Sequence, residues 1–271
     1  MPPPAHLFII TGASRGFGRS LALALAERPS PSSFLLLGGR SADALERAAA
    51  DVRRAAPDAA VAAHPLDLSD ASALPGLAPL LAAFLPAGPP SQPPLSLTLV
   101  HNAGTLGPLQ PVSAAPHLPD LLAATTANLT SYMYLSSLLL SLLPPEHVPL
   151  TQLINVSSLA ARKPFPTWSV YCALKAARDM HLSTAAAELH GGSALRGCLS
   201  YAPGPMDTDM QGEIRGSGTC DAGTREYFKR AKEGGELVDP DVSAAKLAGL
   251  IGGKIGGGGY ETGTHVDFYD V

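Results

Sequence analysis

The sequence predicts an α/β fold in which a doubly wound, mostly parallel sheet of seven strands carries helices on both faces. Short apolar runs with strand character alternate with longer helical patterns along the whole chain. The strand runs are continuously apolar, which is typical of parallel strands covered on both faces. Polar and glycine residues then follow six consecutive strands, and right-handed crossovers bring such strand ends to one edge.

The expected elements follow one another in a regular order. The predicted strands cover residues 6–12, 34–40, 61–69, 95–104, 151–158, 196–205 and 264–269. The predicted helices cover residues 18–28, 41–56, 70–85, 118–143, a segment from 169 onward and 242–251. The stretch between residues 205 and 242 is expected to be irregular.

The composition favours one large domain over residues 1–271. The chain is 46% hydrophobic and 15% charged, and it shows no internal repeat. The proline-rich stretch 85–96 is too short to separate two domains and is interpreted as a surface loop. A net charge of -4 gives no electrostatic support for binding nucleic acid.

The cysteines and the chain start predict a cytoplasmic protein. Cys172, Cys198 and Cys220 form no CxxC pair and no metal-ligand spacing, so we expect reduced thiols and no metal site. The N-terminus has no basic region, and no signal peptide is evident. The longest apolar stretch, 132–150, is interrupted by serines and prolines, so we expect a buried helix and no membrane span.

The loop after the first strand predicts a dinucleotide site. Gly12, Gly16 and Gly18 follow a strand and open a helix. Glycines allow a tight turn and a close approach to a pyrophosphate, which rests on the helix N-terminus. An ordinary glycine turn is the alternative, but the strand and helix on either side favour the cofactor. Ser14 and Phe17 complete the expected contacts of this loop.

Two arginines favour NADP(H) over NAD. Arg40 ends the second strand, where an acidic residue would bind the ribose 2′-hydroxyl of NAD, and Arg15 lies in the glycine loop. No acidic residue occurs nearby until Asp43. The alternative is that both arginines are solvated surface residues. Ser41, beside Arg40, is a further expected cofactor contact.

The end of the third strand is open to two interpretations. Asp67 and Leu68 could line the adenine of the cofactor. Asp67 could equally cap the next helix, as could Ser69 or Asp70.

Tyr171 and Lys175 stand four residues apart and therefore share one helix face. A free phenol is a poor proton donor at neutral pH, and a nearby cation lowers its pKa. The pair thus predicts general acid–base chemistry. The alternative is an ordinary helix in which the tyrosine is half buried and the lysine extends to solvent.

Taken together, these motifs resemble the short-chain dehydrogenase/reductase family, a Rossmann-type fold, over nearly the full chain. The matching pieces are TGASRGFG, HNAG, Asn128 in TTANLTS, INVSS, Tyr171-x3-Lys175 and YAPGP. The resemblance implies a catalytic tetrad of Asn128, Ser158, Tyr171 and Lys175. In it Tyr171 donates the proton, Lys175 tunes the phenol and binds the nicotinamide ribose, and Ser158 holds the carbonyl oxygen.

The serine and the asparagine of this tetrad each have an alternative. The family spacing places the serine thirteen residues before the tyrosine, which selects Ser158, whereas Ser157 would point to the other side of the strand end. Asn128 would support a water that passes protons to Lys175. A helix-interior amide bonded to backbone is the alternative.

The resemblance also implies further cofactor contacts. The segment 201–211 should fold over the nicotinamide. Besides Tyr171 and Lys175, the expected contacts in the later loops are Asn102, Ala103, Gly104, Pro203, Gly204, Met206, Thr208 and Met210. For the glycine-rich stretch 212–223, a mobile lid and a plain flexible loop both remain open.

A narrower resemblance concerns the substrate. The segments around Tyr171, 201–211 and the C-terminal HVDFYD are similar to a branch of the family that reduces side-chain ketones of pterins. A pterin presents an amino group and a ring N–H side by side, and one carboxylate, Asp267, can accept both. An exposed aspartate on an edge strand is the alternative. The expected substrate contacts are Ser158, Leu159, Tyr171, Gly204 and Asp267.

The sequence leaves three matters open. Apolar walls could come from side chains that could equally be core: Leu106, Phe165, Trp168, Met206 and Met210. A broad reductase of diketones or quinones is the nearest rival function, and a non-catalytic NADP(H)-binding regulator is another. The resemblance implies that the apolar helices 118–143 and 170–189 pair subunits; we expect a homodimer, and a tetramer is the open alternative.

Overall fold

In the computed structural model of the chain, seven parallel strands form one sheet. The described residues are 6–28, 32–39, 41–85, 96–143, 151–188, 195–255 and 259–271. The strands stand in the order β3-β2-β1-β4-β5-β6-β7, with every neighbouring pair parallel. They are β1 (His6–Thr11), β2 (Ser32–Leu37), β3 (Ala60–His64), β4 (Ser96–His101), β5 (Thr151–Val156), β6 (Leu195–Ala202) and β7 (Thr264–Asp267). The predicted fold class is confirmed.

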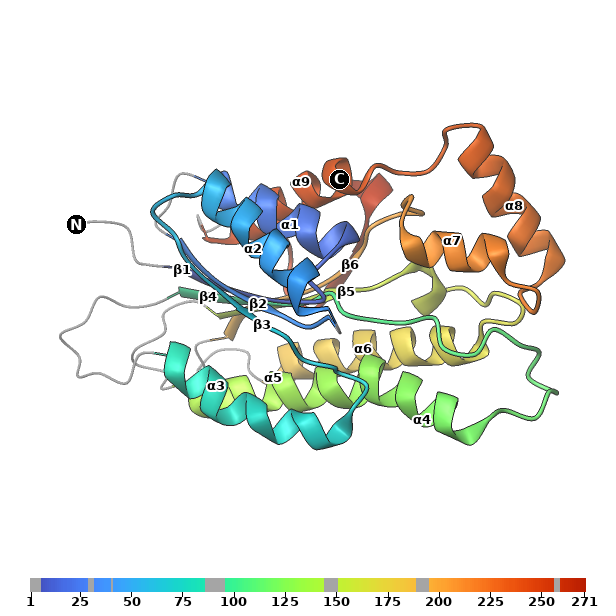
Figure 1. The fold of residues 1–271 in the computed structure, drawn as a ribbon, viewed down its shortest axis with the longest axis horizontal. Helices are drawn as coiled ribbons and strands as arrows, with labels where there is room; N and C mark the ends of the chain where they lie inside the picture. The colour runs from blue at the N-terminus through green and yellow to red at the C-terminus, as the bar shows by residue number, and fades with distance from the viewer. Residues whose placement is uncertain are drawn as a thin grey trace.

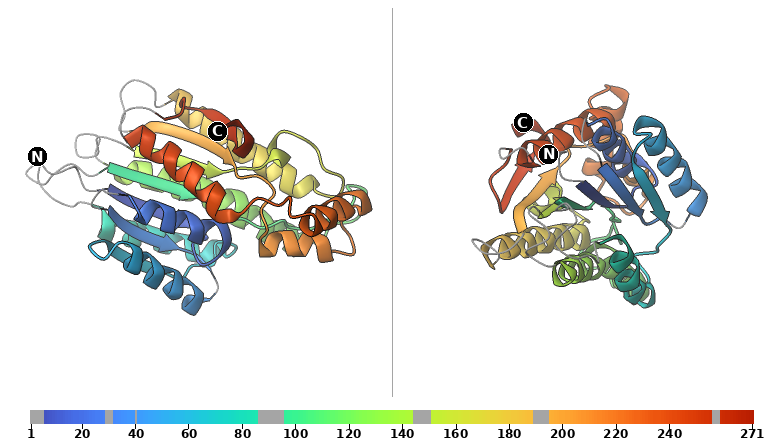
Figure 2. Two further views of the ribbon diagram at one scale, coloured as in Figure 1. Left: turned by 90° about the horizontal axis from the view of Figure 1, so that it is seen from above. Right: turned by 90° about the vertical axis from the view of Figure 1, so that its left-hand side faces the viewer.

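Helices cover both faces of the sheet (Figure 1). One face carries α1 (Gly16–Ala26), α2 (Ala42–Ala55) and α9 (Pro240–Ile255). The other carries α3 (Leu77–Phe84), α4 (Leu118–Thr125), α5 (Ser131–Leu142) and α6 (Ser169–Glu188). Two more helices, α7 (Asp209–Gly216) and α8 (Ala222–Glu233), extend beyond one end of the sheet, as Figure 2 also shows.

Side chains of the central strands alternate between two apolar cores. Phe8 and Ile10 of β1 pack toward the α1 and α9 face, with Leu21 and Leu247. Leu7 and Ile9 pack toward α5 and α6, among residues such as Leu135 and Leu182. Because both faces are covered, every position of β1 is buried, which explains its unbroken apolar run. Full burial of one such side chain stabilises the fold by about 1.5–3 kcal/mol.

The structure corrects the sequence-based expectation for the stretch between residues 205 and 242. Residues 209–216 and 222–233 are helical, so the prediction of an irregular stretch is wrong there. The glycines in this region disfavour helix locally, but Ile214 and Phe228 pack into a cluster with Trp168. Burial of these few apolar side chains outweighs the local preference.

The predicted helix 118–143 contains a break in its regular winding. Residues 126–130 form one π-helical turn between α4 and α5, and Asn128 is buried within it. Single π turns inside α-helices are frequent at functional sites. The predicted last strand ends early, at Asp267, and residues 268–270 form a 3-10 turn.

Some predictions fall on residues outside the described ranges. They concern Arg40 and most of the loop 85–96. Among the described helices, none combines the length and apolar character that crossing a membrane requires.

Candidate functional site

The glycine loop lies between β1 and α1 and is closely packed against its neighbours. Gly12 has a φ of +66°, and its N–H donates to the Leu37 carbonyl at 2.9 Å. A Cβ at Gly12 would stand 2.9 Å from the Cα of Ala103, so only glycine fits. A Cβ at Gly18 would collide with the carbonyl oxygen of Gly12. This compact turn delivers the chain directly into α1.

The N-terminus of α1 has the features of an anion site. Arg15 occupies the N-cap position and makes no side-chain capping hydrogen bond among the described residues, while Gly16 is exposed with a φ of +53°. The first N–H groups of a helix lack intrahelical partners and favour a phosphate. Phe17 belongs to the core instead, since its ring stacks on Tyr201 at 6.3 Å. Ser14 lies beside Gly39, at the end of β2.

The loop after β4 is bonded to the glycine loop. The Asn102 Nδ2 donates to the carbonyls of Thr11 and Gly12, at 3.0 Å each, and the Ala103 N–H donates to Thr11 Oγ1 at 3.0 Å. A Cβ at Gly104 would stand 2.9 Å from Asn128 Oδ1. Asn102 therefore holds two strand ends together, and Gly104 makes room for Asn128.

At the end of β3 the structure decides between the open alternatives for capping. Asp70 caps the following 3-10 turn (Ala71–Gly76), accepting from the Ser72 N–H at 2.9 Å. Asp67 accepts from the N–H and hydroxyl of Ser69, at 2.9 and 2.7 Å, and so shapes the preceding turn. Leu68 is buried in the core that faces α5.

Ser41 at the start of α2 has a structural bond of its own. Its Oγ accepts from the Ala44 N–H at 3.2 Å, which makes it the N-cap of α2. The contact predicted between Ser41 and the cofactor stays a prediction.

The segment after β6 passes over the glycine loop. Gly204 has a φ of +80°, and a Cβ there would stand 2.9 Å from Val238. A Cβ at Gly16 would stand 3.7 Å from Thr208 Cγ2. Next in the chain, Asp209 forms an ion pair with Arg15. The predicted contacts from this segment and from the glycine loop are thus brought together.

Three further residues of this segment anchor it. The Pro203 carbonyl accepts from Ser243 Oγ at 2.9 Å. Met206 pairs with Val238 in an isolated parallel bridge, and Met210 packs against the cluster of Trp168.

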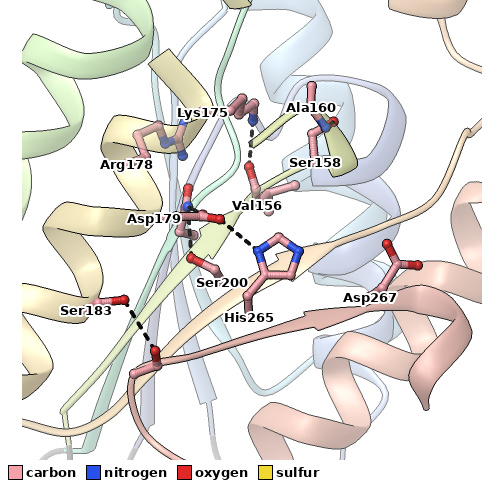
Figure 3. Close-up of polar contacts among 12 residues, drawn as sticks. Val156, Ser158, Ala160, Lys175, Arg178, Asp179, Ser183, Ser200, His265 and Asp267 are labelled. Atoms are coloured by element: carbon pink, nitrogen blue, oxygen red, sulfur yellow. Dashed lines mark hydrogen bonds and ion pairs between the residues drawn. The ribbon is translucent and has the colours of Figure 1, made fainter. Parts of the chain in front are cut away.

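Ser158, Tyr171 and Lys175 meet at the end of β5. Tyr171 and Lys175 share one face of α6, and the Lys175 Nζ lies 5.6 Å from the centre of the phenol ring. Lys175 is only 4% exposed and donates to the Val156 carbonyl at 2.6 Å (Figure 3). Ser158 caps the 3-10 turn Leu159–Ala161. Its Oγ accepts a hydrogen bond from the Ala160 N–H at 3.1 Å. Ser157 is buried, whereas Ser158 is half-buried.

The expected effect of Lys175 on the phenol is wrong. Burial raises the pKa of Tyr171 to about 12, against smaller lowering effects of a hydrogen bond with Ser158 and of the Arg178 charge. Burial also holds the pKa of Lys175 well below its usual range, with a further lowering by Arg178. The net effect on the phenol is a raised pKa, so Tyr171 is kept protonated at neutral pH, as a proton donor requires.

The side-chain amide of Asn128 forms hydrogen bonds with backbone groups. Its Nδ2 donates to the carbonyls of Thr105 and Ala124, at 3.0 and 2.8 Å, and its Oδ1 accepts from the Thr105 N–H at 3.0 Å. These bonds match the alternative interpretation of Asn128 as a helix-interior amide bonded to backbone. The amide fastens the loop after β4 to the π turn, and the predicted water relay stays a prediction.

Arg178 is a buried cation that the sequence interpretation missed. It is 1% exposed, and its guanidinium donates to the carbonyls of His101 and Ala103, at 2.6 and 3.0 Å. It also lies over the ring of Tyr132, 4.7 Å from its centre. Its position three residues after Lys175, on nearly the same helix face, is the signal that could have found it.

Asp267 is half-buried at the end of β7. Its Oδ1 accepts from the Tyr269 N–H at 3.2 Å, and its own N–H donates to Asp270 at 3.2 Å, so it caps the last turn of the chain. Figure 3 shows Asp267 on β7, with Ser158 and Lys175 at the same end of the sheet; β6 lies between β7 and β5. The carboxylate retains acceptor capacity beyond its capping bond.

Apolar side chains cover the site on the side of α7 and α8. Trp168 stacks on Phe165 and Phe228, with ring centres 5.1 and 6.1 Å apart, and meets Tyr171 edge-on at 5.8 Å. Leu106 is buried in the same cluster, while Leu159 is exposed. The pocket walls predicted from the sequence are therefore largely packed against one another.

Comparison with known proteins gives consistent matches. The family model described as short chain dehydrogenase matches residues 6–217. The chain is 37% identical to "Sepiapterin reductase" of Bos taurus and 39% identical to that of Meriones unguiculatus, covering 97% of this chain and 94% and 95% of those proteins. It is also 31% identical to "Benzil reductase ((S)-benzoin forming)" of Bacillus subtilis (strain 168), over 91% of this chain and 93% of that protein.

Solved structures agree with these matches. The crystal structure of the KRED1-Pglu enzyme superimposes with a TM-score of 0.77 at 26% identity, covering 96% of this chain and all of that one. A short-chain dehydrogenase/reductase from Saccharomyces cerevisiae gives a TM-score of 0.77 at 25% identity, over 98% and 96% of the two chains.

Proposed function

The chain belongs to the short-chain dehydrogenase/reductase family, and on that premise we propose that it is an NADPH-dependent reductase of pterin side-chain ketones, acting on sepiapterin. The observation that carries this proposal is the 37–39% identity, over 97% of the chain, to proteins named sepiapterin reductase. The reaction would turn a ketone into an alcohol, a late reduction on the way to tetrahydrobiopterin.

The phenol of Tyr171 is the proposed proton donor. When bound, NADPH supplies the hydride to the ketone carbon, and negative charge builds on the ketone oxygen. Tyr171 gives its proton to that oxygen, and Ser158 donates a hydrogen bond that holds the oxygen near the phenol. The raised pKa of Tyr171 means that the phenol is already protonated when the substrate arrives. Lys175 is proposed to bind the nicotinamide ribose, and Asn128 to support the proton path behind it.

The exposed N-terminus of α1 and the turn at Gly12 fit a dinucleotide phosphate. The segment from Pro203 to Met210 is proposed to close over the nicotinamide end. NADP(H) rather than NAD(H) is proposed because Arg15 presents an exposed cation at the loop. Replacing Arg15 with Ala should raise the KM for NADPH about tenfold, the loss of roughly one charged hydrogen bond, and leave the KM for NADH unchanged.

Asp267 is proposed to anchor the pterin ring. Its carboxylate stands half-buried at the end of β7, on the same edge of the sheet as Ser158. Gly204 and Leu159 are the other proposed substrate contacts, because they follow β6 and β5 at that edge.

We also propose that residues 1–271 form one domain and that two chains pair as a homodimer in the cytoplasm. The sheet joins strands from both ends of the chain. Exposed apolar side chains on α4, α5 and α6, among them Leu122, Met133 and Met180, support the pairing surface. The described cysteines are unpaired, in keeping with a reducing compartment. Light scattering of the purified protein tests the dimer.

A broad diketone reductase is the second candidate, favoured by the match to benzil reductase. The first experiment follows NADPH oxidation with sepiapterin and with benzil, for the native protein, Tyr171→Phe and Asp267→Asn. Tyr171→Phe should lower kcat about 10²–10⁴-fold on both substrates while NADPH still binds. Asp267→Asn should raise the KM for sepiapterin far more than the KM for benzil. Native protein that binds NADPH and reduces benzil only would overturn the pterin proposal.

A further inference from the structure

Helix α6 carries four polar side chains along one face, and only two of them belong to the proposed chemistry. Tyr171, Lys175, Asp179 and Ser183 are spaced four residues apart, so they lie one above the other. The first two stand at the proposed active site. The last two face the C-terminal edge strand, as Figure 3 shows.

Asp179 bonds to two strands at once. Its Oδ2 lies 2.7 Å from Nδ1 of His265 on β7, and its Oδ1 accepts from Asn155 Nδ2 on β5 at 2.8 Å. The same Nδ2 lies 3.2 Å from Ser200 Oγ on β6. The side chains of His265 and Asp179 are only 10% and 14% exposed, so solvent weakens their interaction little.

The His265 ring must donate in this pair. Although burial acts to raise it, the pKa of Asp179 is lowered overall, chiefly by its hydrogen bond with His265. The carboxylate is therefore ionised at neutral pH and can only accept, so Nδ1 of His265 carries the hydrogen.

Strand β7 lies at an edge of the sheet, so bonds from other elements help to fix its position. It pairs with β6 over four residues, from Thr264 to Asp267. At the turn before it, Ser183 Oγ donates to the Gly263 carbonyl at 3.3 Å. Of these two hydrogen bonds between α6 and the region of β7, the Asp179 contact is the shorter and better shielded.

The geometry connects this attachment to the proposed substrate anchor. His265 and Asp267 are two residues apart on one strand and therefore point to the same side of the sheet. Val266 and Phe268, on the opposite side, pack against the core of α1 and α9. Asp267 is thereby tied through His265 to the helix that carries Tyr171.

We propose that the Asp179–His265 pair is a positioning device that sets the place of Asp267 relative to the Tyr171 phenol, and so selects substrates that can span both groups. A pterin that binds Asp267 at one end must present its ketone to Tyr171 at the other. A small diketone contacts only the Tyr171 end, so its binding does not depend on the position of β7. This inference rests on the proposed function and adds His265 and Asp179 to it as positioning residues.

The test compares two conservative replacements of His265. The amide nitrogen of His265→Asn can take the place of Nδ1 and keep the bond to Asp179. In His265→Gln the amide nitrogen lies where Nε2 was, so the bond is lost while polarity is kept. We expect His265→Gln to raise the KM for sepiapterin about tenfold. The kcat with sepiapterin, and both kcat and KM with 2,3-butanedione, should change less than about twofold. His265→Asn should stay within about threefold of the native KM.

A double-mutant cycle with Asp267→Asn shows whether the effect passes through the anchor. In the Asp267→Asn background, the tenfold effect of His265→Gln on the KM should disappear. His117→Ala serves as the control, since this exposed histidine pairs with Asp120 at 3.2 Å, away from β7.

Several outcomes would overturn the inference. It fails if His265→Asn and His265→Gln raise the KM for sepiapterin equally, or if His265→Gln raises the KM for 2,3-butanedione as much as that for sepiapterin. It also fails if the effects of His265→Gln and Asp267→Asn on the KM for sepiapterin add independently. Native protein that does not reduce sepiapterin would instead refute the proposed function. The two failures are therefore distinguishable.

Discussion

The part of the molecule with the proposed phosphate site, residues 6–104, and the part with the proposed substrate contacts, residues 151–271, are held together in different ways; we call them the cofactor half and the substrate half. In the cofactor half the strand ends are fixed by glycines that have no room for a side chain, such as Gly12 against Ala103, and by bonds that end on backbone, such as those of the Asn102 amide to the carbonyls of Thr11 and Gly12. In the substrate half, side chains distant in sequence make the decisive contacts, such as His265 with Asp179 and Trp168 with Phe228.

This difference explains how each half tolerates change. A backbone turn that binds phosphate is shared by many sequences, because its contacts use groups that every residue has. A side-chain network holds one geometry and loses it when one partner changes. We therefore expect the substrate half to tune specificity, whereas the cofactor half keeps a common function.

Trp168→Ala should have the largest effect on stability and tests the substrate half. Trp168 is buried among Phe165, Phe228 and Tyr171, and truncating such a residue costs about 3–5 kcal/mol. Urea unfolding followed by circular dichroism measures the loss. The control is Tyr227→Ala, an exposed aromatic next to Phe228, which should cost far less. Equal losses would mean that the cluster does not hold this half.

Arg178→Met tests the connection between the two halves. It removes a buried guanidinium from α6 and leaves the carbonyls of His101 and Ala103, at the end of β4, without that donor. Each buried carbonyl left unpaired costs about 1–3 kcal/mol. We expect lower stability in urea together with weaker NADPH binding by fluorescence titration. Unchanged NADPH affinity would separate Arg178 from the cofactor half.

Gly18→Ala tests the cofactor half directly. The added methyl group would meet the Gly12 carbonyl and the Asn102 amide, and such overpacking costs about 1–3 kcal/mol. The control is Gly249→Ala within α9, where nothing stands within 4 Å of the new Cβ and helix propensity predicts a gain of about 0.5–1 kcal/mol. Thermal unfolding of both variants compares them, and a loss in Gly249→Ala as large as in Gly18→Ala would contradict the packing argument.

The smallest expected effect is the change of kcat with pH. Because burial raises the pKa of Tyr171 to about 12, the phenol stays protonated through the neutral and mildly alkaline range. The proton donor is lost only as pH rises through that pKa, so kcat with sepiapterin should stay within about twofold between roughly pH 7 and pH 10. An alkaline fall in kcat centred near neutrality would mean that Lys175 lowers the pKa of the phenol after all.

Much of the cofactor half could be predicted from the sequence. Gly12, Gly16 and Gly18 lie between an apolar strand and a helix, and this local order is enough to place the turn. The helical pair of Tyr171 and Lys175 is equally local, because a spacing of four residues fixes a shared face.

The site chemistry was harder to predict, because burial cannot be read from spacing. The sequence suggested that Lys175 lowers the pKa of Tyr171, yet both groups are enclosed and burial dominates. The helices α7 and α8 were missed for a related reason: their glycine-rich pattern is weak, and packing on Trp168 makes them helical.

By itself, then, the sequence determined the order of the strands and of the helices other than α7 and α8, the glycine turn and the helix face of Tyr171 and Lys175, because each depends on residues close in the chain. Only the tertiary structure decided that Arg178 is a buried cation beneath the site and that His265 meets Asp179 across 86 positions. Contacts over such separations form only when the whole sheet is assembled, and the low polarity inside it then sets the charges.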